Sequence, residues 1–160
     1  MFAQRLFTAV GSNIVDVSFF SPGTATLALV SGFGAVFTDV DLTSSTKIEF
    51  FDAANASLGI YAVPVGTVGS ESLSFLGVSF TDGPVISHVQ ITSGNTALAA
   101  GINDGSPIGP DNVVDIVAMD DFIYGAPAVS PVPEPETYAM LLAGLGLIGA
   151  ISRRRKTSMN

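Results

Sequence analysis

Short apolar runs separated by turn-forming residues fill residues 14–124 of this chain. The runs are rich in β-branched and aromatic residues, and Gly, Pro, Asn and Asp stand between them, where they favour turns. No stretch before Tyr138 shows the 3.6-residue apolar period of a helix. The sequence therefore predicts an all-β fold, a β-sandwich for which we expect a jelly-roll topology. The expected strands cover residues 14–20, 24–30, 35–42, 47–51, 58–63, 73–80, 86–92 and 113–124.

Composition excludes several kinds of chemistry. The 160 residues include no cysteine, which rules out disulfides, thiol catalysis and cysteine-ligated metal centres. The formal net charge of −8 argues against binding to nucleic acid, because such binding needs a basic surface.

The positive charge is concentrated at the C-terminus. Four of the six basic residues form one run, Arg153, Arg154, Arg155 and Lys156. Residues 138–151, one residue before it, carry no charge, and as a helix they would extend about 21 Å at roughly 1.5 Å per residue. A bilayer core is about 30 Å thick, so the segment is too short to span it comfortably and suits a signal-like hydrophobic helix. We expect this membrane segment to comprise Tyr138, Leu141, Leu142, Leu145, Leu147, Ile148 and Ile151. The basic run would stay in the cytoplasm by the positive-inside rule.

A Pro-Glu-Pro tripeptide, Pro133, Glu134 and Pro135, stands just before this segment. A Pro-Glu-Pro tripeptide, a short apolar helix and a terminal Arg cluster, in that order, resemble the PEP-CTERM sorting signal of Gram-negative bacteria. The resemblance implies recognition by an exosortase, a membrane transpeptidase-like enzyme, then removal of the tail and delivery to the cell surface or extracellular matrix. We expect three parts: a β-sandwich ectodomain (1–126), a Pro-rich linker with the motif (127–136), and the hydrophobic helix with its basic tail (137–160).

The body also resembles a known kind of sequence. FGAVFTDVDL, KIEFFDAANASLG and MDDFIYG are similar to a domain that recurs ahead of PEP-CTERM signals, and this resemblance implies no particular activity. An exported protein needs an N-terminal signal, yet residues 1–10 lack the apolar core of a signal peptide. We therefore expect the natural protein to extend upstream of Met1.

Four aspartates are candidates for a Ca²⁺ site. Asp120 and Asp121 lie in the last expected strand, and Asp39 and Asp41 alternate along an earlier one, which would place the latter two on one face. Jelly rolls that bind carbohydrate often hold structural Ca²⁺ with such carboxylates, and Ca²⁺ takes 6–8 oxygen ligands. Surface charge is the competing interpretation for all four residues.

Catalytic patterns are missing from the sequence. His88 is the only histidine; we expect it and Gln90 to face outward while Val89 and Ile91 face the core. No G-x-S-x-G elbow accompanies it, so we expect no enzyme activity. The absence of tryptophan and the three tyrosines weaken, without excluding, a carbohydrate-binding surface.

Three functions follow from these observations. The favoured one is an exported surface or matrix protein whose partners are an exosortase and, transiently, the inner membrane. The alternative is a calcium-assisted module that binds exopolysaccharide. A secreted hydrolase is the third and least favoured.

Overall fold

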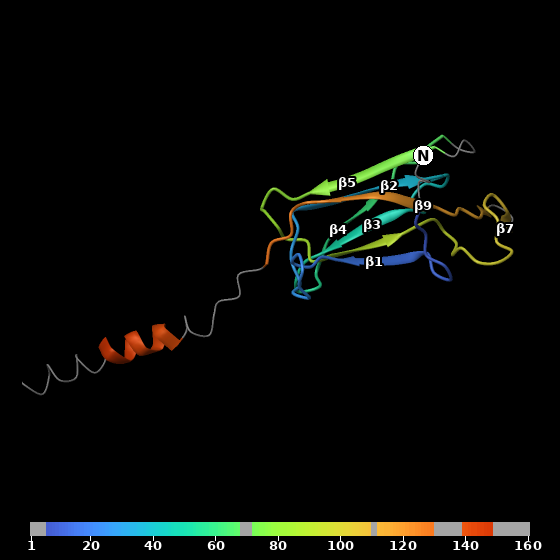
Figure 1. The fold of residues 1–160 in the computed structure, drawn as a ribbon. Helices are drawn as coiled ribbons and strands as arrows, with labels where there is room; N and C mark the ends of the chain where they lie inside the picture. The colour runs from blue at the N-terminus through green and yellow to red at the C-terminus, as the bar shows by residue number, and fades with distance from the viewer. Residues whose placement is uncertain (1–5, 68–71, 110–111, 130–138, 149–160) are drawn as a thin grey trace, which may run out of the picture. The chain divides into compact units, whose positions relative to one another are not determined.

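The computed structural model describes residues 6–67, 72–109, 112–129 and 139–148. The chain divides into two compact units, residues 1–129 and residues 130–160. The first unit is built of strands, and the second contains one helix over residues 139–148 (Figure 1). The strands are β1 (Ile14–Ser18), β2 (Gly32–Thr38), β3 (Lys47–Phe51), β4 (Ser57–Ala62), β5 (Leu73–Ser79), β6 (His88–Thr92), β7 (Pro107–Gly109), β8 (Asn112–Val113) and β9 (Ala118–Tyr124).

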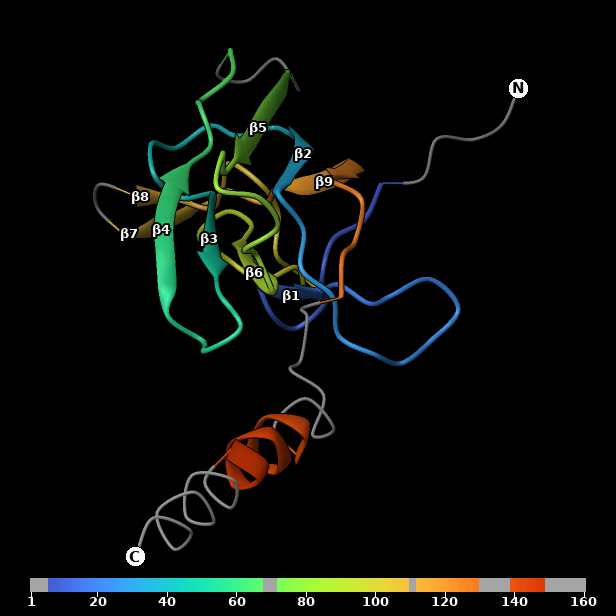
Figure 2. The same cartoon turned by 90° about the vertical axis from the view of Figure 1, so that its left-hand side faces the viewer.

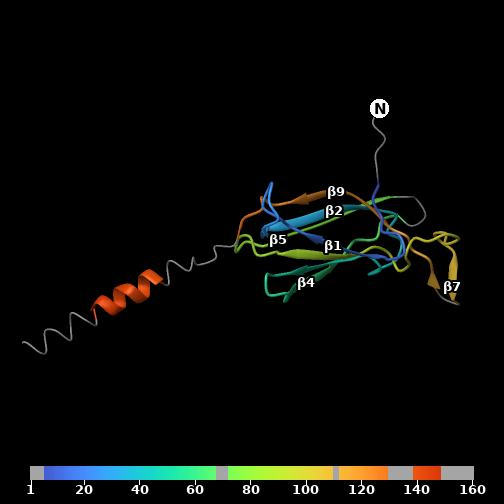
Figure 3. The same cartoon turned by 60° about the horizontal axis from the view of Figure 1, so that its bottom comes forward.

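Two antiparallel sheets form the body. One has the order β1-β6-β3-β4 and the other β5-β2-β9, while β7 and β8 make a separate small ribbon. The two sheets lie in separate layers, with β2, β5 and β9 in one layer and β1 and β4 in the other (Figure 3). Figure 2 shows the same arrangement from the end of the body, with β7 and β8 off to one side. The prediction of a mostly β fold in two sheets with a short C-terminal helix is confirmed.

Alternating side chains decide which face of each strand is buried. In β3, Ile48 and Phe50 are fully buried, whereas Lys47 is exposed and Glu49 half-buried. In β6, Val89 and Ile91 are fully buried, as the sequence predicts. Successive residues of a strand point to opposite faces, so each strand supplies one apolar face to the core.

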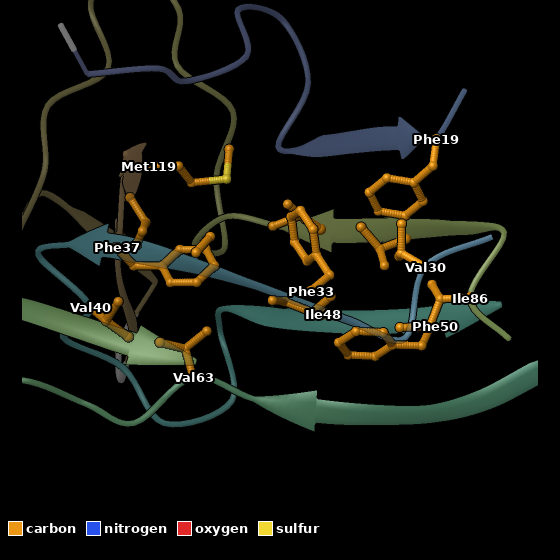
Figure 4. Packing of buried hydrophobic residues seen from close by; sticks show 14 residues of the cluster. Phe19, Val30, Phe33, Phe37, Val40, Ile48, Phe50, Val63, Ile86 and Met119 are labelled. Atoms are coloured by element: carbon orange, nitrogen blue, oxygen red, sulfur yellow. The ribbon is translucent and has the colours of Figure 1, made fainter. Parts of the chain in front are cut away.

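The core lies between the two sheets. Phe33 and Phe37 come from β2, Met119 from β9, and Ile48 and Phe50 from β3, and all five belong to one buried cluster (Figure 4). Burying apolar surface contributes about 25 cal/mol per Å², so a side chain as large as phenylalanine contributes roughly 1.5–3 kcal/mol. Side chains from both sheets meet in this cluster, and this contact holds the two layers together.

Three of the expected strands differ clearly from the observed ones. The expected strand 113–124 is divided into β8 and β9, and residues 114–117 between them are not in a strand, because the N–H groups of Asp115 and Ile116 donate to the side chains of Asn95 and Asp104. Residues 24–30 form only isolated bridges, among them Phe20 with Leu27 and Val30 with Ile86, rather than a strand. The Ser21-Pro22-Gly23 turn explains part of this. The Ser21 N–H donates to the Thr26 carbonyl, and the Thr24 N–H donates to the Ser21 carbonyl, so these groups bond within the turn instead of to a neighbouring strand. The expected strand 35–42 ends at Thr38, since Asp39 has a φ of +61° that a strand cannot accommodate.

Candidate functional site

The predicted sorting signal lies mostly outside the described residues. Pro133, Glu134, Pro135, Tyr138, Ile151 and the basic run from Arg153 to Lys156 all fall there. The described part of the signal is the helix over residues 139–148, which carries Leu141, Leu142, Leu145, Leu147 and Ile148. Their side chains are exposed by 58–69%, so the helix presents apolar side chains all round.

The helix is short. Its ten residues span about 15 Å at roughly 1.5 Å per residue, about half the thickness of a bilayer core. Among the described residues, no helix has both the length and the apolar character that crossing a membrane requires.

Asp39 and Asp41 do not share a strand face. Both follow β2, and the positive φ of Asp39 breaks the alternation on which the expectation of a common face rests. The Asp39 N–H donates to the Ser72 carbonyl at 2.9 Å, and the Asp41 N–H donates to Asp115 Oδ1 at 3.3 Å. The expectation that these two carboxylates lie side by side on one strand is therefore wrong.

Asp120 and Asp121 lie on β9 at an irregularity of the sheet. Gly34 pairs with Ile123 and Val36 with Asp120, so two residues of β9 lie opposite one residue of β2. This is a β-bulge, and Asp121 has a φ of +48° within it. The Asp121 N–H donates to Asp120 Oδ1 at 2.8 Å, so one carboxylate of the pair caps its neighbour's backbone.

The structure does not gather these four aspartates into one metal centre. Within the described ranges, no group of three or more His, Asp or Glu side chains is placed to hold a metal ion. Calcium binding stays a prediction.

A buried carboxylate that the sequence did not single out, Asp115, contacts the loop between β2 and β3. Asp115 is fully buried, accepts hydrogen bonds from the Ser45 hydroxyl and the Asp41 N–H, and donates its own N–H to Asn95 Oδ1 at 2.9 Å. Its signal in the sequence is an acid in the middle of the apolar run VVDIV. None of the described buried side-chain N and O atoms lacks a hydrogen-bond partner, so Asp115 is a satisfied structural group.

Thr46 and Gly94 extend the same network. The hydroxyl of the fully buried Thr46 accepts a hydrogen bond from the Gly94 N–H at 2.9 Å, and Asn13 Nδ2 donates to the Gly94 carbonyl at 3.0 Å. Loops that follow β2 and β6 and precede β1 and β9 therefore meet at one end of the body. The polar groups at this end of the body hydrogen-bond to one another, so their role is structural.

The outer face of the four-stranded sheet carries a group of polar side chains. Its middle row places Asp16, Gln90 and Glu49 side by side on β1, β6 and β3. Gln90 Nε2 donates to Asp16 Oδ1 at 3.0 Å, and the Ser57 hydroxyl donates to Glu49 Oε1 at 2.7 Å. We call these four residues the polar row.

His88 lies on this face, as the sequence predicts. Its ring is stacked on Phe51 with a centroid distance of 4.6 Å and an interplanar angle of 1°. The imidazole therefore packs against a neighbouring aromatic ring, and its Nδ1 lies 3.5 Å from the Ser87 hydroxyl oxygen.

Comparison with known proteins identifies the C-terminal segment. Residues 131–156 match the model of the PEP-CTERM protein-sorting motif. The chain thus carries that motif, and the match supports an exported protein that an exosortase recognises and sorts to the cell surface. No curated protein and no solved structure matches the chain at a significant level.

Proposed function

We propose that this chain is a non-catalytic surface or extracellular-matrix protein of a Gram-negative bacterium, delivered by its C-terminal signal. The observation that carries the proposal is the sorting motif over residues 131–156. The motif directly follows a β-sheet body that ends at residue 129 in its own compact unit. A body that folds separately can persist after the tail is removed.

Charge gives the proposed route a direction. Residues 1–130 carry twelve acidic and two basic residues, whereas the basic run from Arg153 to Lys156 lies near the C-terminus. Positive residues beside an apolar segment remain on the cytoplasmic side, which leaves the acidic body outside. In this scheme the apolar segment lodges transiently in the inner membrane, and an exosortase cleaves close to Pro133–Pro135.

Intact-mass analysis of the surface-exposed form, in a host that has an exosortase, tests the scheme. We expect a mature protein that ends near residue 135 and lacks the basic run. Replacing Pro133 and Pro135 together by alanine should preserve the uncleaved tail, and Pro127→Ala, outside the matched residues, is the control. A surface form that still ends at Asn160 would contradict the proposal.

We infer a jelly-roll topology for the body from its strand order. In an eight-stranded jelly roll, the second, seventh, fourth and fifth strands form one sheet, and the first, eighth, third and sixth form the other. Among the residues that the structure describes, the order β1-β6-β3-β4 follows the first of these sheets, and β9-β2-β5 follows the eighth, third and sixth strands of the second.

A calcium-assisted carbohydrate-binding module is the second candidate. The observation that favours it is the polar row, where side-chain carboxylate and amide groups on adjacent strands are already held by hydrogen bonds. Such groups pair well with the hydroxyls of a polysaccharide, and holding them in place in advance lowers the entropy cost of binding.

A glycan array, with and without a calcium chelator, separates this candidate from the first. Binding that is lost in Asp16→Ala/Gln90→Ala and kept in Asp82→Ala, a change in an exposed turn, would support it. Sensitivity to the chelator would show that binding depends on calcium. Uniform lack of binding would leave the sorting role as the function.

A further inference from the structure

The outer edge of β5 is an open edge of the three-stranded sheet. β5 pairs with β2 on one side, and within the described ranges no strand or isolated bridge pairs with it on the other (Figure 2). Its pairing with β2 runs over all seven residues of the strand without a bulge. β5 is therefore a regular strand with one side available for pairing.

The backbone groups that face this edge follow from the hydrogen bonds at the two ends of β5. The Phe80 N–H donates to the Ser31 carbonyl at 2.8 Å, and the Asp39 N–H donates to the Ser72 carbonyl at 2.9 Å. Residues 72 and 80 thus bond toward β2, and so do the even-numbered residues between them, because the backbone groups of neighbouring strand residues point in opposite directions. The N–H and C=O groups of the odd-numbered residues point to the open edge. These edge-facing residues, all exposed, are Leu73, Phe75, Gly77 and Ser79.

Charge and regularity separate this edge from the other described edges of the two main sheets. Natural sheet edges avoid unwanted pairing through charged residues, prolines or bulges. β1 carries Asp16, β9 carries Asp120 and Asp121, and the pairing of β4 with β3 is irregular at Phe50 and Phe51. β5, with the sequence LSFLGVS, has no charged residue, proline or bulge. Its edge lacks all three of these protections.

The absence of charge favours a second copy of the same chain as the partner. Residues 1–130 carry twelve acidic and two basic residues, so two bodies repel each other over most of their surfaces. Two β5 edges can approach without placing like charges directly opposite each other. A strongly charged partner would find no complementary charge on this strand.

We propose that β5 pairs antiparallel with β5 of a second copy, so that the two three-stranded sheets become one continuous sheet. One register uses every edge-facing N–H and C=O group. It places Leu73 opposite Ser79 of the second copy and Phe75 opposite Gly77 of the second copy, and each such pair exchanges two hydrogen bonds. A shift of two residues in either direction leaves edge-facing groups without a partner.

Side chains fit the same register. On the outer face, Phe75 meets a glycine of the second copy and so meets no opposing side chain. Its ring already lies over Gly77 of its own chain, since a Cβ built on Gly77 would stand 2.7 Å from that ring. On the inner face, Leu76 lies at the two-fold axis, opposite Leu76 of the second copy. Leu76 is half-buried and packs against the core, so pairing would cover the part of it that is still exposed.

Disulfide cross-linking in the full chain tests the register. The chain has no cysteine, so a single introduced thiol reports on one position. In a non-hydrogen-bonded antiparallel pair the two Cα atoms lie about 4.5 Å apart, within the range of about 4.4–6.8 Å that a disulfide spans. We expect Leu76→Cys, oxidised with copper phenanthroline, to give a covalent dimer on non-reducing electrophoresis.

Val78→Cys is the matched control, because Val78 is also half-buried on the inner face of β5. In the proposed register its two copies are four residues apart along the paired strands, about 13 Å at roughly 3.3 Å per residue. That distance is too long for a disulfide. We expect at least about tenfold less covalent dimer than with Leu76→Cys.

A second pair of variants tests the backbone hydrogen bonds without cross-linking. Ser79→Pro removes an edge-facing N–H and leaves the bonds to β2 in place, so it should raise the dimer dissociation constant by about tenfold or more. Ser79→Ala keeps the N–H and should leave that constant unchanged. Sedimentation of the full chain in mild detergent, which covers the apolar side chains of residues 139–148, measures both.

Four results would overturn the proposal. A full chain that stays monomeric at every concentration would exclude the dimer. Equal cross-linking of Leu76→Cys and Val78→Cys would mean that the copies meet by collision or through the tail, and stronger cross-linking of Phe75→Cys would exclude the register. Slow hydrogen exchange at Gly77 in a monomeric chain would show that the edge is covered by the same chain.

Discussion

Gly94 lies directly against the backbone of Asp115: a Cβ built on Gly94 would stand 1.9 Å from the Asp115 carbonyl oxygen. Gly94 also has a φ of +66°, which side chains disfavour. The segment after β6 therefore approaches the segment before β9 as closely as two backbones can. Asn95 reinforces the contact, because its N–H donates to the same carbonyl at 3.0 Å.

Gly94→Ala should destabilise the body strongly. The new methyl group would collide with backbone atoms of Asp115, which cannot move aside as a flexible side chain can. The positive φ of residue 94 would also be strained in alanine. We expect a loss of about 3 kcal/mol or more, measured by urea denaturation. Gly83→Ala is the control, since its φ is also positive at +97° but a Cβ there has nothing within 4 Å. Similar losses in both variants would show that backbone conformation, rather than the contact, sets the cost.

Asp115→Ala should also lower stability. It removes the acceptor of hydrogen bonds from the Ser45 hydroxyl and the Asp41 N–H at a fully buried position. Leaving the half-buried Ser45 hydroxyl and Asp41 N–H without their acceptor costs about 1–3 kcal/mol. Thermal unfolding of Asp115→Ala beside Asp82→Ala, an exposed acid, checks this value. Equal melting temperatures would mean that the buried network adds nothing to stability.

Phe50→Ala should be among the most damaging changes to the core. Phe50 is fully buried and its ring contacts Tyr61 and Phe80 edge to face. Truncating a buried phenylalanine costs about 3–5 kcal/mol because of the lost burial and the cavity that is left. Leu73→Ala, at a side chain that is 70% exposed on β5, should cost under about 1 kcal/mol. The difference between the two urea midpoints is the measurement.

Gly34→Ala tests the outer face of the three-stranded sheet. There a groove of about 470 Å³ is lined by Gly32, Gly34 and Gly77 together with Phe75 and Ile123. A Cβ on Gly34 would come within 2.9 Å of the Gly77 Cα and of the Leu76 carbonyl oxygen, so β2 and β5 would have to separate. We expect a loss of about 1–3 kcal/mol in urea denaturation. An unchanged midpoint would show that the two strands can shift without cost.

The strands whose alternation is regular were predictable from the sequence. β3 and β6 show it most clearly, because their apolar residues fall on one face with a period of two. Residues 24–30 have the composition of a strand but receive no continuous partner, and pairing depends on where the rest of the chain lies. Asp39 could not be recognised as the end of β2, since its left-handed conformation leaves no mark in composition.

For the candidate sites too, features that depend on local sequence were predictable, and features that depend on distant residues were not. The sorting motif was predictable because it is a local pattern, read in order along residues 131–156. Asp115 was missed because its role depends on Ser45 and Asn95, which lie 70 and 20 residues away in the chain. A single acid among apolar residues is the one local sign of such a network, and it does not indicate which residues bond to that acid.

The pairing of β2 with β9 has a consequence for the order in which the protein can form. β9 is the last strand of the body, and it lies beside one of the first, so the three-stranded sheet cannot close until residue 124 is available. Contacts between residues so distant in sequence form slowly, because a long loop must be closed first. Residue 124 lies only a few positions before the sorting motif begins at residue 131. The body thus completes its fold only when nearly all the chain that precedes the sorting motif is present, so folding and the arrival of the tail are closely linked in time.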